Sequence, residues 1–501
     1  MSHIRTGLML VAAVGCGGGD GGPAFEPNHI EDPQPHEGGG LGSGAILGEL
    51  NVFVIDGRTD QVVSGADVYL GAGDTKERVV GRTNADGLVI FRENPGSEDT
   101  DVVEAPEDSL AGPQIVTAIA EDYAATTWFG VNGAVVTLPI EPAQPEDDDE
   151  FDMATVTGTI AGWDNLPDPP MGRFLVAFVN YTARGDLDAP ENAIAQAIHT
   201  DPILNAIGIP QNTCARGMLS PVLPFDSCDW TLATRTGPQA IYAGLLTIDP
   251  MAADLDPQPL GFAAKTGFDL AADDVEANVA LDIVDSSDLA DLEVVLEDPP
   301  SGLSEVATTA VLDLGDEGQL VVPVPATLAS IPVPKPTGDL DGEYVIYSSA
   351  KSDPAEDHPV SLIAERDADV DGEVQMGEWL DVPDDIDEDL VAIPNTYRFG
   401  RVDGADVHAV AFDDTDGTHA WNVLFLEPPS TGEAPDAGVE PSLVFSFALP
   451  ILPEDPLPKG NVDFTVSAFE LPSFDPLDFV LDSLEDTIQQ WSVDQDTFRR
   501  E

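Results

Sequence analysis

Short runs of apolar residues, separated by Gly, Asp, Asn and Pro, recur along most of this chain. Between Gly48 and Pro142 the runs occupy residues 50–55, 66–70, 88–91, 115–119 and 134–138. Apolar runs of this length, bounded by turn-forming residues at regular intervals, are typical of the strands of a β-sandwich. Further runs occupy residues 174–181, 239–248, 279–284, 292–296 and 445–447, with a short helix expected at 190–199. The pattern therefore predicts a mainly β protein of tandem antiparallel β-sandwich modules.

The pattern changes near the C-terminus. Asp475 and Pro476 are typical of an N-cap followed by the first residue of a helix. Beyond them, apolar residues recur at helical spacing and share one helical face: Leu477, Val480, Leu481, Leu484, Ile488 and Trp491. We expect a C-terminal helix that closes the last sandwich, or, as the alternative, one that docks a partner.

The N-terminus carries a pattern of its own. A short positive start, Met1–Arg5, precedes the apolar run Leu8–Val14 and the small residues that lead into Cys16. This order resembles a bacterial lipoprotein signal, which implies cleavage before Cys16 and acylation of its thiol. The residue after the cysteine is Gly17 rather than Asp, which by the same resemblance implies the outer membrane. We expect an anchored protein of the bacterial cell envelope, either surface-exposed or facing the periplasm.

Two stretches without apolar periodicity divide the rest of the chain. Residues 16–47 are rich in Gly, Pro and acidic residues, and residues 145–150 form an acidic run, so neither can pack into a core. We predict a signal peptide at 1–15, a disordered tether at 16–47, a first sandwich at 48–142, an acidic linker at 143–153, a second β-rich domain at 154–297, a third at 298–474, and a C-terminal helix and tail at 475–501.

The first predicted sandwich carries a family resemblance. Its opening segment, Val63-x-Gly65-Ala66-x-Val68-x-Leu70, is followed by Thr83-Asn84-Ala85-Asp86-Gly87 and then by Ala118 and Tyr123. These residues resemble a carboxypeptidase regulatory-like domain. The resemblance implies a transthyretin-like β-sandwich that serves as an accessory module and carries no catalytic residue. The turn at Ala85-Asp86-Gly87 is expected to place Gly87 at a positive φ.

Charge limits the partners that the protein can have. The chain of 501 residues has 93 acidic and 19 basic side chains, a formal net charge of −74. Such a surface repels phosphate backbones and anionic bilayers, which excludes nucleic acid as a partner. Contact with the membrane is then expected only through the lipid anchor. An extracellular protein or a glycan is left as a possible partner.

The remaining two cysteines suggest a disulfide. With Cys16 lipidated, Cys214 and Cys228 are an even pair in an oxidising compartment. No histidine lies near them in the sequence, which argues against a metal or redox pair.

One acidic segment matches a calcium-binding loop. The stretch from Asp367 to Glu378 follows the pattern D-x-D-x-D-G-x₅-E at every specified position. The expected ligands are Asp367, Asp369, Asp371, Glu373 through its carbonyl, Gln375 through water, and Glu378. Pro359 and Pro383 leave no room for flanking helices, so we expect a structural calcium ion held between strands.

No catalytic motif accompanies these features. The sequence has no H-E-x-x-H, G-x-S-x-G or phosphate-binding loop. The sequence therefore favours a non-enzymatic, lipid-anchored surface protein, stabilised by calcium, with a structural or ligand-binding role. A carbohydrate-binding surface protein is one alternative, with Trp128, Phe129, Trp163, Trp379 and Trp421 as candidate contacts. A secreted hydrolase is the other, and requires that His408, His419 and acidic residues share one cleft.

Overall fold

The computed structural model describes residues 30, 32–71, 79–95, 102–107, 109–110, 112–144, 153–183, 211–220, 223–249, 251–252, 257–272, 274–324, 330–353, 358–384, 386–388, 396–414, 418–426, 444–450, 452, 456–457, 459–471, 474–481 and 488–500. Helical structure within these residues is limited to 3-10 turns: η1 (Trp163–Asn165), η2 (Ser286–Asp288), η3 (Gly315–Glu317) and η4 (Gly338–Leu340). None of the described helices is long and apolar enough to cross a membrane. The prediction of a mainly β protein is confirmed.

The described strands form five sheets. The first contains, in spatial order, β31 (Phe479–Val480), β1 (Gly40–Ala45), β9 (Gly133–Ile140), β2 (Glu49–Asp56), β5 (Leu88–Glu93) and β6 (Val102–Ala105). A 12-stranded sheet, called the long sheet below, contains β20 (Gln319–Val324), β19 (Glu305–Asp313), β22 (Glu343–Lys351), β23 (Val360–Glu365), β32 (Gln490–Arg500), β30 (Gly460–Glu470), β27 (Val407–Asp414), β28 (His419–Phe425), β8 (Ala125–Val131), β7 (Gln114–Ile119), β3 (Asp67–Leu70) and β4 (Val79–Arg82).

The described strands also form three further sheets. The 8-stranded sheet contains β13 (Leu223–Ser227), β12 (Thr213–Ser220), β11 (Phe174–Tyr181), β15 (Gly237–Ile248), β16 (Gln258–Leu270), β17 (Val275–Ile283), β10 (Met153–Ala161) and β14 (Trp230–Arg235). Two small sheets contain β21 (Ile331–Pro334), β18 (Leu289–Val295) and β24 (Glu373–Gln375), and β25 (Asp387–Glu388), β26 (Thr396–Gly400) and β29 (Val444–Ala448).

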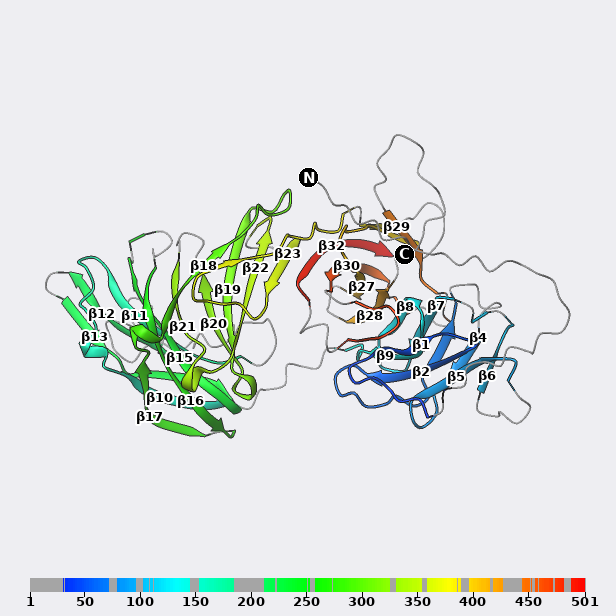
Figure 1. Cartoon of the computed structure of the whole chain (residues 1–501), viewed down its shortest axis with the longest axis horizontal. Helices are drawn as coiled ribbons and strands as arrows, with labels where there is room; N and C mark the ends of the chain where they lie inside the picture. Colours follow the sequence, from blue (N-terminus) through cyan, green and yellow to red (C-terminus); the bar gives the residue numbers. More distant parts are fainter. Residues whose placement is uncertain are drawn as a thin grey trace, which may run out of the picture.

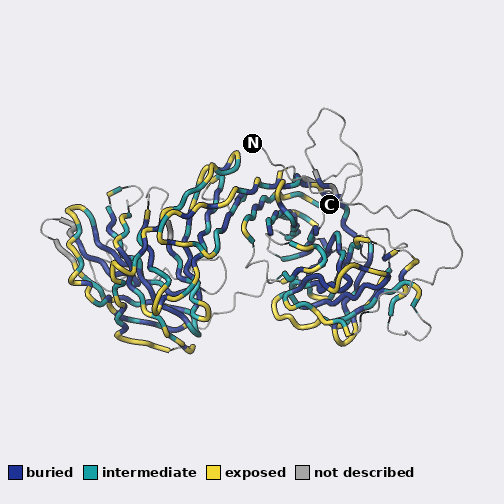
Figure 2. The backbone as a smooth tube through the Cα atoms, viewed as in Figure 1, coloured by how far each residue is buried: buried dark blue, intermediate teal, exposed yellow. Residues whose placement is uncertain are grey.

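Two groups of strands are visible in Figure 1, and the long sheet runs through both of them. One group holds β10 to β23, and the other holds β1 to β9 together with β27 to β32. Figure 2 shows that the buried backbone follows the strands of both groups, while exposed backbone is concentrated at the turns. Each group therefore has its own apolar interior.

The strands expected in the first sandwich are present as β2, β3, β5, β7 and β9. The Ala85-Asp86-Gly87 turn is also present: Gly87 has a φ of 69°, and the Asn84 carboxamide oxygen accepts hydrogen bonds from two backbone N–H groups of the turn. Regular structure begins earlier than predicted, because β1 lies inside the range expected to be a tether. Leu41 explains the difference, since it is fully buried in the first core.

The long sheet has apolar cores on both of its faces. Successive residues of a strand point to opposite faces, so β8 can supply Trp128 to one core and Phe129 to another. The first core lies against the sheet that contains β2 and β9, and the second is formed with β26 and β29. β8 pairs in parallel with β28, which follows it by almost 300 residues.

The predicted C-terminal helix is wrong. The Asp475 carboxylate accepts a hydrogen bond from the Leu477 N–H at 2.9 Å, and this contact belongs to a turn that leads into β31. β31 then pairs with β1, and β32 pairs with both β30 and β23. The helical spacing was a local signal, and pairing with strands distant in the sequence overrides it.

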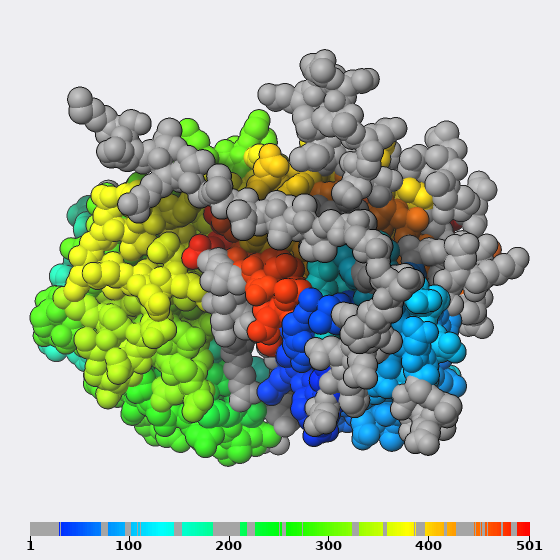
Figure 3. Space-filling model, turned by 45° about the vertical axis from the view of Figure 1, so that its right-hand side comes forward, coloured from blue at the N-terminus to red at the C-terminus, as the bar shows by residue number. Residues whose placement is uncertain are grey.

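Figure 3 shows the outcome, with C-terminal residues in orange and red beside the blue N-terminal residues. The domain boundaries given above stay predictions. Strand pairing within the long sheet joins residues from the predicted first and third domains.

Candidate functional site

An apolar cavity of about 430 Å³ lies where β11, β15 and β16 face β20 and β21. Its apolar wall includes Phe178, Leu246, Pro259, Phe262, Val322 and Ile331. The alternation of β15 explains how the wall is built: Ile241 and Ala243 belong to the core of the 8-stranded sheet, while Tyr242 and Gly244 line the cavity. One sheet thus covers its own core on one face and the cavity on the other.

The two sides of the cavity are held together by Tyr242. Its hydroxyl lies 3.2 Å from both the carbonyl oxygen and the amide nitrogen of Val321 in β20, donating to the first and accepting from the second. Burial raises the pKa of the Tyr242 hydroxyl to about 12, so the group stays neutral at physiological pH. Because both of its hydrogen bonds go to Val321 in the cavity wall, this hydroxyl is not open to a ligand.

Two amides provide the other polar groups at the cavity. Asn212 is fixed, because its side-chain nitrogen donates to the Val179 carbonyl at 2.8 Å while the Val179 N–H donates back to the Asn212 carbonyl. Asn180 is half-buried, and its side-chain amide makes no hydrogen bond with any residue that the structure describes. The described lining contains no charged residue.

Gly244 leaves open space in the wall. An added Cβ at this position would meet no atom within 4 Å, and its φ lies outside the left-handed region. Beside it, the β15–β16 register shifts between Leu245 and Leu246, which leaves Leu260 as an extra residue in β16. Bulges and strand glycines often mark places where a ligand approaches the backbone. Gly244, in the middle of an apolar run, was the one signal of this cavity in the sequence.

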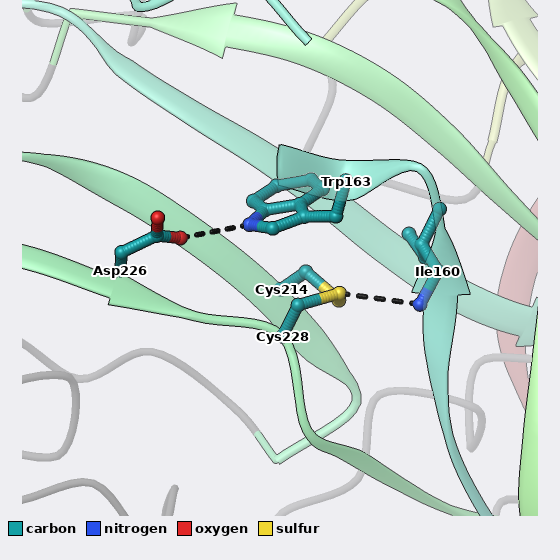
Figure 4. The surroundings of a disulfide bond; sticks show 5 residues. All are labelled: Ile160, Trp163, Cys214, Asp226 and Cys228. Carbon is teal, nitrogen blue, oxygen red and sulfur yellow. Dashed lines mark hydrogen bonds between the residues drawn. A yellow bond between two sulfur atoms is a disulfide. The ribbon is translucent and has the colours of Figure 1, made fainter. Parts of the chain in front are cut away.

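Cys214 and Cys228 form the expected disulfide. Figure 4 shows it between the Ile160 backbone, whose N–H donates to the Cys228 sulfur at 3.3 Å, and the Trp163 indole. The indole N–H donates to the Asp226 carboxylate at 2.9 Å. Because Cys214 follows Asn212 by two residues, the disulfide fixes the segment that leads into the cavity.

The predicted calcium loop is strand and turn. Asp371 donates its N–H to the Asp369 carboxylate, and the Asp371 carboxylate lies 3.2 Å from the Lys335 ammonium. The Gln375 amide hydrogen-bonds to the Glu373 carboxylate, and Glu373–Gln375 forms β24, which pairs with β18. Asp367 has a positive φ. Glu378 lies near Glu470 of β30, whose carboxyl pKa is raised by burial and by the negative charges of Asp406 and Glu378.

These carboxylates do not converge on a point. Over the whole described part of the chain, no three His, Cys, Asp or Glu side chains form a group that could hold a metal. Calcium binding at this segment stays a prediction from the motif.

The two histidines of the hydrolase alternative lie at opposite ends of the β27–β28 hairpin. His408 pairs with Phe425, whereas His419 pairs with Asp413. His408 is 3% exposed, and its Nε2 accepts a hydrogen bond from the Val402 N–H. His419 is partly exposed, and its Nδ1 lies 2.7 Å from the Asp413 carboxylate. The structure does not bring the two rings into one cleft.

Most of the predicted aromatic contacts belong to cores. Trp128, Phe129, Trp163 and Trp421 are all buried, and Trp379 is half-buried with its indole N–H donated to the Glu297 carbonyl. A different aromatic pair was not among the predicted contacts. Phe469 and Trp491 are half-buried neighbours on β30 and β32, with ring centroids 6.4 Å apart and planes 10° from parallel. Trp491 was assigned to the helix that is not present.

Cys16, the predicted lipidation site, lies outside the described residues.

Comparison with known proteins assigns no family. No family model matches the chain, and no curated protein matches it. Similar solved structures include the TIE protein of Bacillus anthracis (12% identity, 66% of this chain and 50% of that chain, TM-score 0.13). Others are the shaft pilin of Lactobacillus rhamnosus GG (13%, 47% and 97%, TM-score 0.12) and a streptococcal ancillary pilin (9%, 66% and 98%, TM-score 0.11). The chain spans half the length of the TIE protein, and TM-scores this low support no inference.

Proposed function

We propose that this chain is a non-enzymatic, lipid-anchored protein of the bacterial outer membrane whose β-sheet modules present a ligand-binding cavity. The apolar cavity beside Gly244 carries the proposal, because a concave, largely apolar space with a few polar groups is the usual form of a small-molecule site. The lipid anchor is proposed from the resemblance of the N-terminal segment, which leads into Cys16, to a lipoprotein signal. The resemblance of the first sandwich to carboxypeptidase regulatory-like domains supports an accessory role for that module.

The binding role is tested with a neutral fluorescent dye whose emission rises in apolar surroundings, such as Nile red. The full mature chain should bind the dye with a saturable signal. Gly244→Leu should abolish that signal, and Gly244→Ala should weaken it, because both side chains enter open space. Gly377→Leu is the matched control, since Gly377 is exposed and an added Cβ there meets only a distant Gln490 atom. Equal binding by Gly244→Leu and the parent chain would remove the cavity as the site.

The anchor has an independent test. Cells that express the full chain should incorporate labelled palmitate into it, and Cys16→Ser should lose the label and move to the soluble fraction. Label retained by Cys16→Ser would contradict the proposal.

Calcium stabilisation is proposed on the motif alone. A Kd of about 10⁻⁴–10⁻³ M would add about 1.4–2.7 kcal/mol at about 10 mM calcium. For a domain of ordinary size this raises the melting temperature by about 3–10 °C. The matched variants are Asp369→Ala, inside the motif, and Asp341→Ala, outside it. An equal rise in both variants would indicate general screening of the negative charge, and no rise would end the calcium proposal.

Carbohydrate binding is the second candidate function. The stacked pair Phe469–Trp491 favours it, because near-parallel, partly exposed rings on one sheet face can stack against sugar rings. A glycan array should then give hits that Trp491→Ala loses and that Gly244→Leu keeps. Hits that survive Trp491→Ala would contradict this site.

A further inference from the structure

The chemistry of the cavity wall narrows the ligand class, an inference that rests on the proposed binding function. No charged side chain lines the described wall, so a carboxylate or an ammonium group would enter without a partner. Burying an unpaired charge is strongly unfavourable, whereas apolar surface gains free energy on transfer. The net charge of −74 adds repulsion against anions. The ligand should therefore be uncharged and largely apolar.

The polar groups suggest where a single polar end would lie. Tyr242 is committed to Val321, and the Asn212 side-chain nitrogen is committed to Val179. Asn180 is different, because it is only half-buried, whereas Asn212 is 3% exposed, and neither the nitrogen nor the oxygen of the Asn180 amide has a hydrogen bond to any described residue. An amide can donate to and accept from one hydroxyl group. A ligand hydroxyl placed at Asn180 would satisfy both the amide and itself.

The volume sets the scale of the apolar part. At about 430 Å³ the cavity lies toward the small end of ligand pockets, which span about 300–1,000 Å³. We infer that the cavity takes an uncharged, single-chain amphiphile of the primary alcohol class, with its hydroxyl at Asn180 and its chain against Phe178, Leu246 and Ile331.

The test displaces the neutral dye with straight-chain alcohols from hexanol to hexadecanol. Each added methylene should tighten binding about fourfold until the cavity is full. The carboxylate and the alkylammonium of equal length should bind more weakly by more than about tenfold. Gly244→Leu should lose all of these ligands, and Gly377→Leu should keep them.

Asn180→Leu separates the polar end from the chain. This variant should weaken the alcohols about tenfold, as expected when one hydrogen bond in an apolar site is lost. It should leave the 1-chloroalkanes of equal length unchanged, which also shows that the variant folds. Equal loss for alcohols and chloroalkanes would overturn the role of Asn180.

The outcomes also separate this inference from the proposed function. If carboxylates displace the dye as well as alcohols do, the ligand class is wrong while the binding cavity stands. If affinity does not depend on chain length, the inference also fails and the cavity stands. If the dye itself does not bind, both fail together.

Discussion

His408 shows how burial sets the charge of a single side chain. Its ring lies among Phe399 and Phe445, and burial, together with the positive charge of Arg401, lowers the pKa of the imidazole to about 4. In the unfolded chain the same group titrates near 6.5, so at pH 5 the unfolded state binds more protons than the folded state. The free energy of unfolding contributed by neutral His408 is therefore fully present above pH 6.5, and it is lost as the pH falls toward 4.

The first prediction follows from that sign. Between pH 7 and pH 5 the folded protein should lose about 2 kcal/mol of unfolding free energy through His408. His408→Gln keeps an acceptor for the Val402 N–H but cannot titrate, so it should flatten this part of the curve. Urea unfolding at the two pH values measures the difference. His419→Gln, at the partly exposed end of the hairpin, is the control, and an equal flattening there would refute the assignment.

Tyr242 gives a second prediction at the residue scale. Tyr242→Phe removes a hydroxyl that both donates to and accepts from Val321, and leaves two partly buried backbone groups without this partner. The loss should be about 1–3 kcal/mol in denaturant unfolding. Tyr344→Phe, which removes a hydroxyl donated to the Pro334 carbonyl, is matched in chemistry but lies outside the cavity. Both variants should lose stability, and only Tyr242→Phe should change dye binding.

These residue roles could be predicted only in part. The sequence named His408 and His419 as candidates for one cleft, but it could not give the β27–β28 register that puts them at opposite ends of the hairpin. It identified the Cys214–Cys228 pair because parity and compartment constrain cysteines. It did not find Asn180 or Tyr242 as cavity residues, because neither differs from ordinary strand residues until the facing sheet is known.

At the scale of elements, the disulfide is the clearest source of added stability. It closes a loop over β12 and β13, with a sequence separation of 14 residues. The third prediction is that the double variant Cys214→Ser, Cys228→Ser loses about 3 kcal/mol of unfolding free energy. Alcohol binding should also weaken, since Asn212 and its contact with Val179 lie next to Cys214. If the folded double variant bound alcohols as well as the parent chain does, the cavity would not depend on this disulfide.

Elements were predictable where the local pattern and the distant partners agree. The run 174–181 coincides with β11, and 239–248 lies within β15, because both strands are apolar and bounded by turn residues. The C-terminal segment failed for the opposite reason. Its spacing fits a helix, yet the open edges of β1, β30 and β23 need partners that only this segment supplies. A sequence pattern does not record which strand edges elsewhere are left unpaired.

At the scale of the whole molecule, the N-terminal sandwich is completed by residues from the other end of the chain. Its core includes Leu426 and Phe479, both of which are buried. The edge of β8 is paired with β28, and Phe129 and Tyr69 belong to the second core, which is formed mostly by residues beyond 396. Without these segments, both an open strand edge and apolar side chains would face water.

The last prediction concerns this dependence. A fragment of residues 30–144 should not fold alone. Tyr69 and Phe129 would face water in the fragment, so the free energy gained by burying them would be lost. The edge of β8 would also be unpaired, which favours aggregation. Coexpression with residues 396–501 should restore a soluble complex, because that segment supplies β28, β31 and the second core. Dispersed amide resonances measure folding in both samples.

The matched control is coexpression with residues 274–383, which contribute to neither core. A well-dispersed spectrum from residues 30–144 alone would show that the sandwich is autonomous and that the C-terminal strands only decorate it. Rescue by residues 396–501 and not by the control would instead establish that the two ends of the chain fold as one body. A lipid anchor at Cys16 would then hold the C-terminal strands directly. It would hold the sheets that form the cavity through the pairing of β23 with β32.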